Sequence, residues 1–169
     1  MPSSKKEFIQ ALKAAIVPIL EEHGGGTFAG WNGQIDLTQR HNPISLPAVF
    51  WEIVSIPWRN VGDKRGGTGQ YTKEGVLNLH VALASMGEDP HIDDNAFDLA
   101  DEIAAAAFKV NGERFGSVYR TEEVQDTTHE QVVTMIETFR FGIADDTTFV
   151  NKTQEKTIST IEFQQNFET

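Results

Sequence analysis

The first segment of the chain carries apolar residues at the three- and four-residue spacing of an amphipathic helix. Ser4-Lys5-Lys6-Glu7 has the form of a capping box, in which a serine and a later glutamate satisfy free amides of the first turn. Pro18 lies inside the helical pattern and is expected to kink or restart the helix, because proline has no amide hydrogen. Three glycines from Gly24 are expected to end it. The predicted apolar stripe is Phe8, Leu12, Ala15, Ile16, Ile19 and Leu20.

Alternating patterns in the middle of the chain predict β-strands. Leu46–Ile56 has apolar residues on both faces, interrupted only by Glu52 on the second face, which favours an interior strand covered on both sides for much of its length. Gly75–Ser85 alternates in the manner of a half-buried strand, and Gln34–Thr38 is a shorter expected strand. Asn60–Lys73 is rich in glycine and has no apolar periodicity. We therefore expect a long loop there between two strands, and not a two-residue hairpin turn.

The second half of the chain predicts a helix followed by two strands. Asp93–Asn95 supplies N-cap residues for a helix that runs to about Val110, and its many alanines favour close packing on a sheet. Arg114–Val124 and Gln131–Ile143 are the expected strands. Apolar residues share one face of the last strand, with only Glu137 among them. The expected buried face of the helix is Phe97, Ala100, Ile103, Ala104, Ala107 and Phe108.

The order of these elements predicts an α+β fold, an antiparallel β-sheet with two main helices packed on one face. Residues 1–146 are expected to form a single domain. Residues 147–169 are rich in Thr, Glu and Gln and are predicted to form a C-terminal arm, which is either disordered or laid on a neighbouring molecule. The candidate contacts of this arm are Ile158, Ile161, Phe163 and Phe167.

Composition excludes several classes of protein. The chain has 169 residues, 39% of them hydrophobic, with no cysteine, which rules out a disulfide scaffold, a cysteine-ligated metal and a thiol nucleophile. The net charge of −11 argues against a surface that coats nucleic acid. No apolar run approaches 18 residues, so we expect no membrane span. Met1–Gln10 lacks the features of a signal peptide, so the expected compartment is the cytoplasm.

The charge is unevenly distributed along the chain. Arg59–Lys73 holds 4 basic residues and 1 acidic residue, whereas Met86–Glu137 holds 13 acidic and 3 basic residues. Four positive charges release few counterions, so any DNA binding through them is expected to be weak and sensitive to salt. The two regions could instead pair neighbouring subunits through complementary fields, or line a channel that repels DNA. The candidate contacts to a neighbour or to DNA are Arg59, Lys64, Arg65 and Lys73.

None of the candidate catalytic or ligand-binding motifs in the sequence has the residues and spacing that its chemistry requires. Gly62–Gln70 precedes a strand and lacks the Gly-Lys-Ser/Thr of a phosphate-binding loop. The acidic residues Glu88–Asp94 surround His91 but lack the spacing of a calcium loop, and helix capping accounts for them better. His80 is expected to be a cross-strand partner and not a base. Glu122 and Glu123 are adjacent and point to opposite faces of the sheet. We therefore expect no catalytic residue, no cofactor and no metal.

Several aromatic residues remain around the predicted loop. Some of them are expected in the core and the rest as anchors at an interface. They are Phe28, Phe50, Trp51, Trp58 and Tyr71.

Lys5–Asp146 resembles the tail-terminator and tail-completion (head–tail joining) proteins of tailed bacteriophages and prophages. The resemblance lies in element order and diffuse patterns, without a diagnostic motif. It is carried by Pro47–Glu52 leading into Trp58, the glycine-rich loop, Leu77–Val81, the helix Phe97–Phe108, and the strands Thr121–Asp126 and Val132–Ile143.

The resemblance implies an α+β fold in which helices back a β-sheet, and a homohexameric ring that caps the tail tube and joins it to the head connector. The implied partners are further copies of the chain, the tail tube protein and connector proteins, with DNA passing through the lumen without sequence-specific binding. The implied location is the tail or neck of the virion, and the host cytoplasm during assembly. No catalytic residue is implied.

Two alternatives stay open. The long arm leaves room for another phage neck or minor tail adaptor protein. A small ligand-binding domain or enzyme would use His80 or the acidic residues around His91, and it would need a concave pocket around them.

Overall fold

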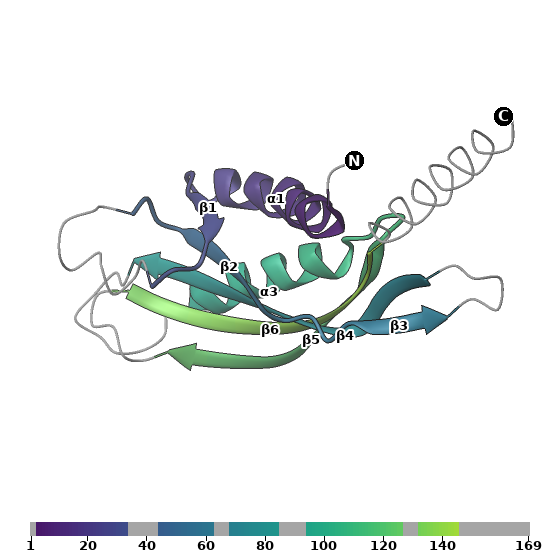
Figure 1. Ribbon diagram of the computed structural model, residues 1–169. Coiled ribbons are helices and arrows are strands. Elements are labelled where there is room, and N and C mark those ends of the chain that lie inside the picture. The colour runs from purple at the N-terminus through teal and green to yellow at the C-terminus, as the bar shows by residue number, and fades with distance from the viewer. Residues whose placement is uncertain (1–2, 34–43, 63–67, 85–93, 127–131, 146–169) are drawn as a thin grey trace, which may run out of the picture.

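Two helices lie against one face of a six-stranded β-sheet, which confirms the expected α+β fold (Figure 1). The computed structural model describes residues 3–33, 44–62, 68–84, 94–126 and 132–145. The helices are α1 (Ser4–Glu22) and α3 (Asp94–Phe108), and the strands are β1 (Thr27–Gly30), β2 (Ala48–Ser55), β3 (Arg59–Gly62), β4 (Thr68–Ala84), β5 (Phe115–Asp126) and β6 (Val132–Asp145).

The sheet is built around the long strand β4. Strands follow the order β1-β2-β4-β6-β5, with β3 pairing β4 outside this path. β6 lines one side of β4, whereas β2 pairs with its second half and β3 with its first few residues. The β1–β2 pair is parallel and the other described pairs are antiparallel, as expected for a sheet backed on one face.

Helix α1 begins one residue earlier than the capping box predicts. The N-cap is Ser3, whose hydroxyl oxygen accepts a hydrogen bond from the backbone amide of Lys6. Glu7 does not complete the box, because its carboxylate is paired with Arg114. Nor does the helix restart at Pro18: it continues as one helix to Glu22, held by buried residues on both sides of the proline. The buried residues of α1 are Ser4, Phe8, Leu12, Ile16 and Leu20.

The end of α1 follows the glycine prediction. His23 caps the helix, and Gly24 and Gly25 have φ angles of 98° and 89°. These angles lie in the left-handed region, which glycine enters without a steric cost. β1 follows directly and was not expected from the sequence, since four residues are too few to show a period.

The main core lies between the helices and the sheet. Phe8 of α1 stacks on Phe141 of β6, with ring centroids 4.5 Å apart, and the apolar residues of β4 and β6 that alternate onto this face are buried. The expected face of α3 was partly wrong: Phe97 and Phe108 are 36% and 66% exposed. Leu99 is buried in their place. The buried face of α3 is Leu99, Ala100, Ile103, Ala104 and Ala107.

The predicted long loop at Asn60–Lys73 was wrong. β3 and the start of β4 form an antiparallel hairpin, with Arg59 opposite Tyr71 and Gly62 opposite Thr68. Residues 63–67 lie outside the described residues. Backbone hydrogen bonds make this pairing, so it requires no apolar alternation and a search for periodicity overlooks it. In Figure 1 the hairpin extends beyond the part of the sheet that the helices cover.

The other face of the sheet holds a smaller apolar cluster. Ala48, Phe50 and Ala82 are buried there, with Trp31 and Leu46 packed against them. The first half of β2 is therefore covered on both faces, as predicted, whereas its second half opens to solvent.

Some predictions concern residues outside the described ranges. The strand Gln34–Thr38 and the arm at residues 147–169 are among them, with the four candidate arm contacts Ile158, Ile161, Phe163 and Phe167. Within the described residues, neither helix combines the length and apolarity that crossing a membrane requires.

Candidate functional site

The β3–β4 hairpin carries two of the four candidate basic contacts at described positions. Nη2 of Arg59 donates to both carboxylate oxygens of Glu74, at 2.9 and 2.8 Å, and both side chains are more than half exposed. Lys73 is exposed. Lys64 and Arg65 lie outside the described residues. The structure thus balances one of the two described positive charges with a neighbouring carboxylate.

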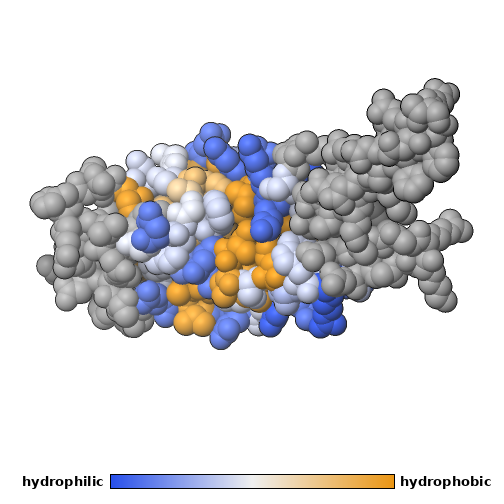
Figure 2. All heavy atoms as spheres, viewed as in Figure 1, coloured by the Kyte–Doolittle hydropathy of each residue, from blue (hydrophilic) through white to orange (hydrophobic). Residues whose placement is uncertain are grey.

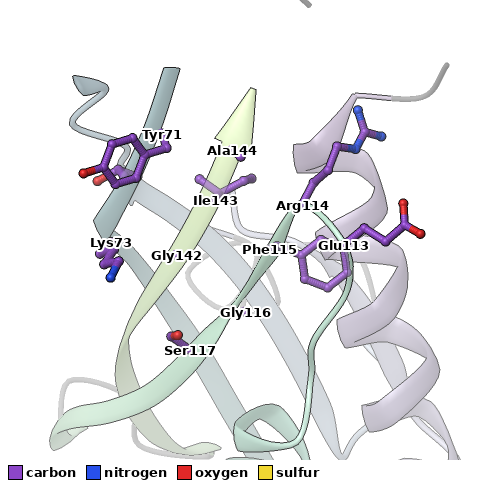
Figure 3. A pocket seen from close by; sticks show the side chains of 11 residues that line it. Tyr71, Lys73, Glu113, Arg114, Phe115, Gly116, Ser117, Gly142, Ile143 and Ala144 are labelled. Atoms are coloured by element: carbon purple, nitrogen blue, oxygen red, sulfur yellow. The ribbon is translucent and has the colours of Figure 1, made fainter. Parts of the chain in front are cut away.

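A surface hollow of about 280 Å³ lies beside the base of the hairpin, where β4, β5 and β6 run together (Figure 3). Tyr71, Lys73 and Ser117 stand at its border, and Gly116 and Gly142 line it without side chains. Register shifts interrupt the regular pairing of β4 and β5 with β6 here, and Ser117 has a φ of 53°. The hollow presents backbone groups at its glycines together with apolar, hydroxyl and charged side chains, a combination that suits contact with another polypeptide.

The sheet face turned away from the helices exposes apolar side chains near β5. Tyr119 and Val124 are 47% and 46% exposed, and they lie opposite Arg140 and Ile136 of β6. On the side of the molecule seen in Figure 2, hydrophobic residues also gather in the middle, over the region where Figure 1 draws the helices and β2, with hydrophilic residues around them. Tyr119 and Val124 share this face of the sheet but lie opposite positions of β6 that are four residues apart, so they are two separate apolar contacts and not one continuous patch.

His80 occupies the structural position expected for it. Its Nε2 lies 3.3 Å from Oε2 of Glu52 on the neighbouring strand, and its ring stacks on Trp31 with centroids 4.0 Å apart. The residue is 6% exposed and does not line the hollow at the hairpin base. The acidic residues around His91 that precede α3 lie outside the described residues. Within the described part of the chain, no three His, Asp or Glu side chains are placed to hold a metal ion.

The expected aromatic set divides between core and surface. Phe50 is 1% exposed and buried on the far face of the sheet, whereas Tyr71 is 40% exposed beside the hollow. Phe28, Trp51 and Trp58 are partly buried against the main core.

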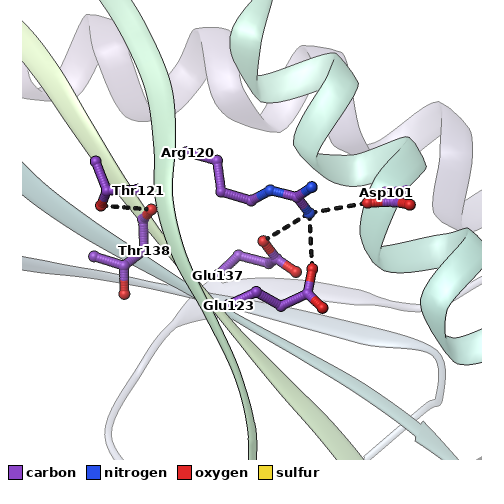
Figure 4. Close-up of polar contacts among 6 residues, drawn as sticks. All are labelled: Asp101, Arg120, Thr121, Glu123, Glu137 and Thr138. Atoms are coloured by element: carbon purple, nitrogen blue, oxygen red, sulfur yellow. Dashed lines mark hydrogen bonds and ion pairs between the residues drawn. The ribbon is translucent and has the colours of Figure 1, made fainter.

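A cluster of charged residues, of which Glu137 alone is buried, joins β5, β6 and α3 (Figure 4). Glu137 of β6 is fully buried on the helix-facing side of the sheet. One nitrogen of Arg120, Nη1, lies 3.2 Å from Glu137, 2.9 Å from Glu123 and 2.9 Å from Asp101. Three carboxylates therefore share one guanidinium nitrogen.

The surroundings of Glu137 favour its neutral form. Burial raises the pKa of the Glu137 carboxyl, and the nearby charge of Glu123 raises it further. The positive charge of Arg120 lowers this pKa in part, and the resulting value is about 7. Oε1 of Glu137 has no hydrogen-bond partner among the described residues. The only sign of this site in the sequence is Glu137 itself, a single glutamate on an otherwise apolar face of the last strand. Its partners Arg120 and Asp101 could not be found from spacing, because the fold brings them together.

Comparison with known proteins adds no relative to this description. No protein-family model matches the chain, and no curated protein matches it.

Proposed function

We propose that the protein is a non-enzymatic structural subunit that assembles into a ring at the tail end or head–tail junction of a tailed bacteriophage. Its partners would be further copies of the chain, the tail tube protein and the connector proteins, with six copies as the expected ring. In the virion it would occupy the tail or neck, with DNA passing through the lumen.

The observation that carries this proposal is the β3–β4 hairpin, which extends past the covered part of the sheet with a hollow at its base (Figures 1 and 3). In the described residues β6 pairs with β4 no further than Gln70, so the outer end of the hairpin is a two-stranded ribbon, which a neighbouring surface would stabilise. The exposed Tyr119 and Val124 offer such a surface on the sheet. A contact between two different patches of identical subunits closes into a ring when the rotation permits.

The chemistry of the described residues supports a structural role over an enzymatic one. His80 is held by Glu52, stacked on Trp31 and buried, and it does not line the hollow beside the hairpin. The hollow beside the hairpin lacks a histidine, and its lining includes no paired acid and base of the kind that hydrolytic sites use. A neck or minor tail adaptor remains the nearest alternative, because it would use the same surfaces.

Electron microscopy of the purified full-length chain tests this function. We expect closed rings with a central opening in class averages at high protein concentration. Particles that stay at the size of one subunit across a wide concentration range would contradict the proposal. Rings that bind tail tubes in a mixture would favour the terminator over an adaptor.

A further inference from the structure

In the described residues, the face of α3 that packs on the sheet is apolar, and a charged cluster lies beside it. α3 packs on the sheet through Leu99, Ile103 and its alanines, and the cluster around Glu137 interrupts this apolar surface. The charged groups that face Glu137 in the described structure are Arg120 and Glu123 from β5 and Asp101 from α3. β4 presents Leu79 to it, and Met135 and Phe139 follow on β6 itself.

The balance of charge in this cluster depends on a single proton. When Glu137 is neutral, Arg120 has two carboxylate partners, Asp101 and Glu123. When Glu137 is ionised, three carboxylates share Nη1 of Arg120, and one of them is fully buried with an unpartnered oxygen. A buried charge without sufficient partners is strongly unfavourable.

We propose that Glu137, Arg120 and Asp101 form a proton-controlled latch that fastens α3 to the sheet when Glu137 is neutral and loosens it when Glu137 is ionised. Separation of α3 relieves the excess charge, because water reaches Glu137 and the helix carries Asp101 away. Asp101 is 67% exposed and Arg120 37% exposed, so both side chains reach solvent at the edge of the contact between α3 and the sheet. The latch is independent of the proposed function in a virion.

The direction of the pH effect follows from the two states of α3. With α3 docked, the pKa of Glu137 is raised to about 7, whereas a solvated glutamate has a value near 4.5. Between these values the docked state holds a proton that the open state releases. The equilibrium constant for opening of α3 therefore increases as the pH rises from about 4.5 to about 7, and it becomes constant above that interval.

Amide hydrogen exchange of the full chain at pH 5.5 and pH 8, corrected for the intrinsic rate, measures this opening. In the wild type we expect protection of the α3 amides to fall by about ten-fold or more between the two conditions, since one pKa unit corresponds to ten-fold. Glu137→Gln should abolish the fall, because the amide stays neutral and can still accept from Arg120. Glu122→Gln is the matched control: this carboxylate lies opposite Thr138, is exposed, and should leave the fall unchanged.

Two results would overturn the latch. One is equal protection of α3 at both pH values in the wild type. The other is a fall that persists unchanged in Glu137→Gln. If the Gln variant does not fold, NMR titration of the Glu137 carboxyl carbon in the wild type decides the matter: a midpoint near 7 supports the latch, and a midpoint near 4.5 refutes it.

Discussion

Gly75 and Phe141 show how a single position shapes the core of this protein. They lie opposite each other on β4 and β6, and a β-carbon at Gly75 would come within 2.6 Å of the Phe141 ring. The ring is fully buried and stacked on Phe8, so it has little room to retreat. Glycine is therefore needed here for space, in a strand whose neighbours favour larger residues.

Gly75→Ala should lower the free energy of unfolding by about 1 to 3 kcal/mol, because it overpacks the core. Urea denaturation measures the loss. Gly116→Ala is the control, since its nearest neighbour, Cβ of Asn111, lies at an ordinary 3.9 Å, and we expect a smaller change. Adding Phe141→Leu to Gly75→Ala should cost less than the sum of the two single changes. Strict additivity would show that the ring is not the obstacle.

Glu137 predicts an unusual pH dependence of global stability. Its folded pKa of about 7 lies above the ordinary 4.5, so the folded state binds a proton that the unfolded state has lost between these values. The free energy of unfolding should therefore contain a term that decreases as the pH rises from 5 to 8, by roughly 1 to 3 kcal/mol. Denaturation of the wild type and of Glu137→Gln at each pH isolates this term. Parallel pH profiles for the two proteins would contradict the assignment.

Single residues were predicted from the sequence where one local pattern decides their role. The stripe of α1 and the alternation of β6 placed Phe8, Leu12, Met135 and Phe139 in the core correctly. His80 was correctly assigned as a cross-strand partner, since it lies beside Glu52 of β2, although the face that was expected to be polar is buried there. The charge cluster could not be predicted, since Arg120 and Asp101 meet Glu137 only after β5, β6 and α3 have packed.

At the scale of elements, the helix termini and the hairpin depart most from the sequence prediction. The capping-box pattern begins at Ser4, but a second serine precedes it, and Ser3 takes the cap while Ser4 is buried. α3 was rotated in the prediction because its two phenylalanines were taken for core residues. Four consecutive alanines leave the apolar face of α3 poorly defined, and Leu99 decides it.

Ser3→Ala tests the observed cap. It should lower the free energy of unfolding by about 0.5 to 2 kcal/mol, because the amide of Lys6 loses the acceptor observed in the structure. Ser3→Asp should retain most of the stability, since its carboxylate can accept the same hydrogen bond near the helix N-terminus. An equal loss in both variants would argue against the cap.

Shortening the hairpin distinguishes its role in assembly from its role in the stability of the fold. Replacing residues 61–69 with Asn-Gly keeps Asn60 opposite Gln70 and supplies a favourable two-residue turn. We expect the free energy of unfolding to change by less than about 1 kcal/mol, because the replacement keeps Arg59 opposite Tyr71 and Asn60 opposite Gln70 and closes them with a favourable turn. We also expect the shortened chain to lose its assembly. A shortened chain that assembles like the wild type would remove the hairpin from the proposed interface.

At the scale of the whole molecule, charge and shape bear on the proposed ring. Four of the 14 basic residues lie in the segment Arg59–Lys73, which carries a net positive charge, whereas the chain from Met86 to Glu137 is strongly acidic. Complementary fields between neighbours are screened by salt beyond about 10 Å at 0.1 M. Assembly measured by light scattering should therefore weaken as the salt concentration rises. Assembly that strengthens with salt would point to apolar contacts such as Tyr119 and Val124 instead.

Native mass spectrometry of the full-length chain tests the central claim most directly, because a ring fixes the number of subunits. The account predicts one dominant assembly, expected to contain six copies of the 18.8 kDa chain, in equilibrium with few intermediates. Closed rings give this distribution since every subunit in them makes both of its contacts. A spectrum with only the single chain, or with an open series of all sizes, would contradict it.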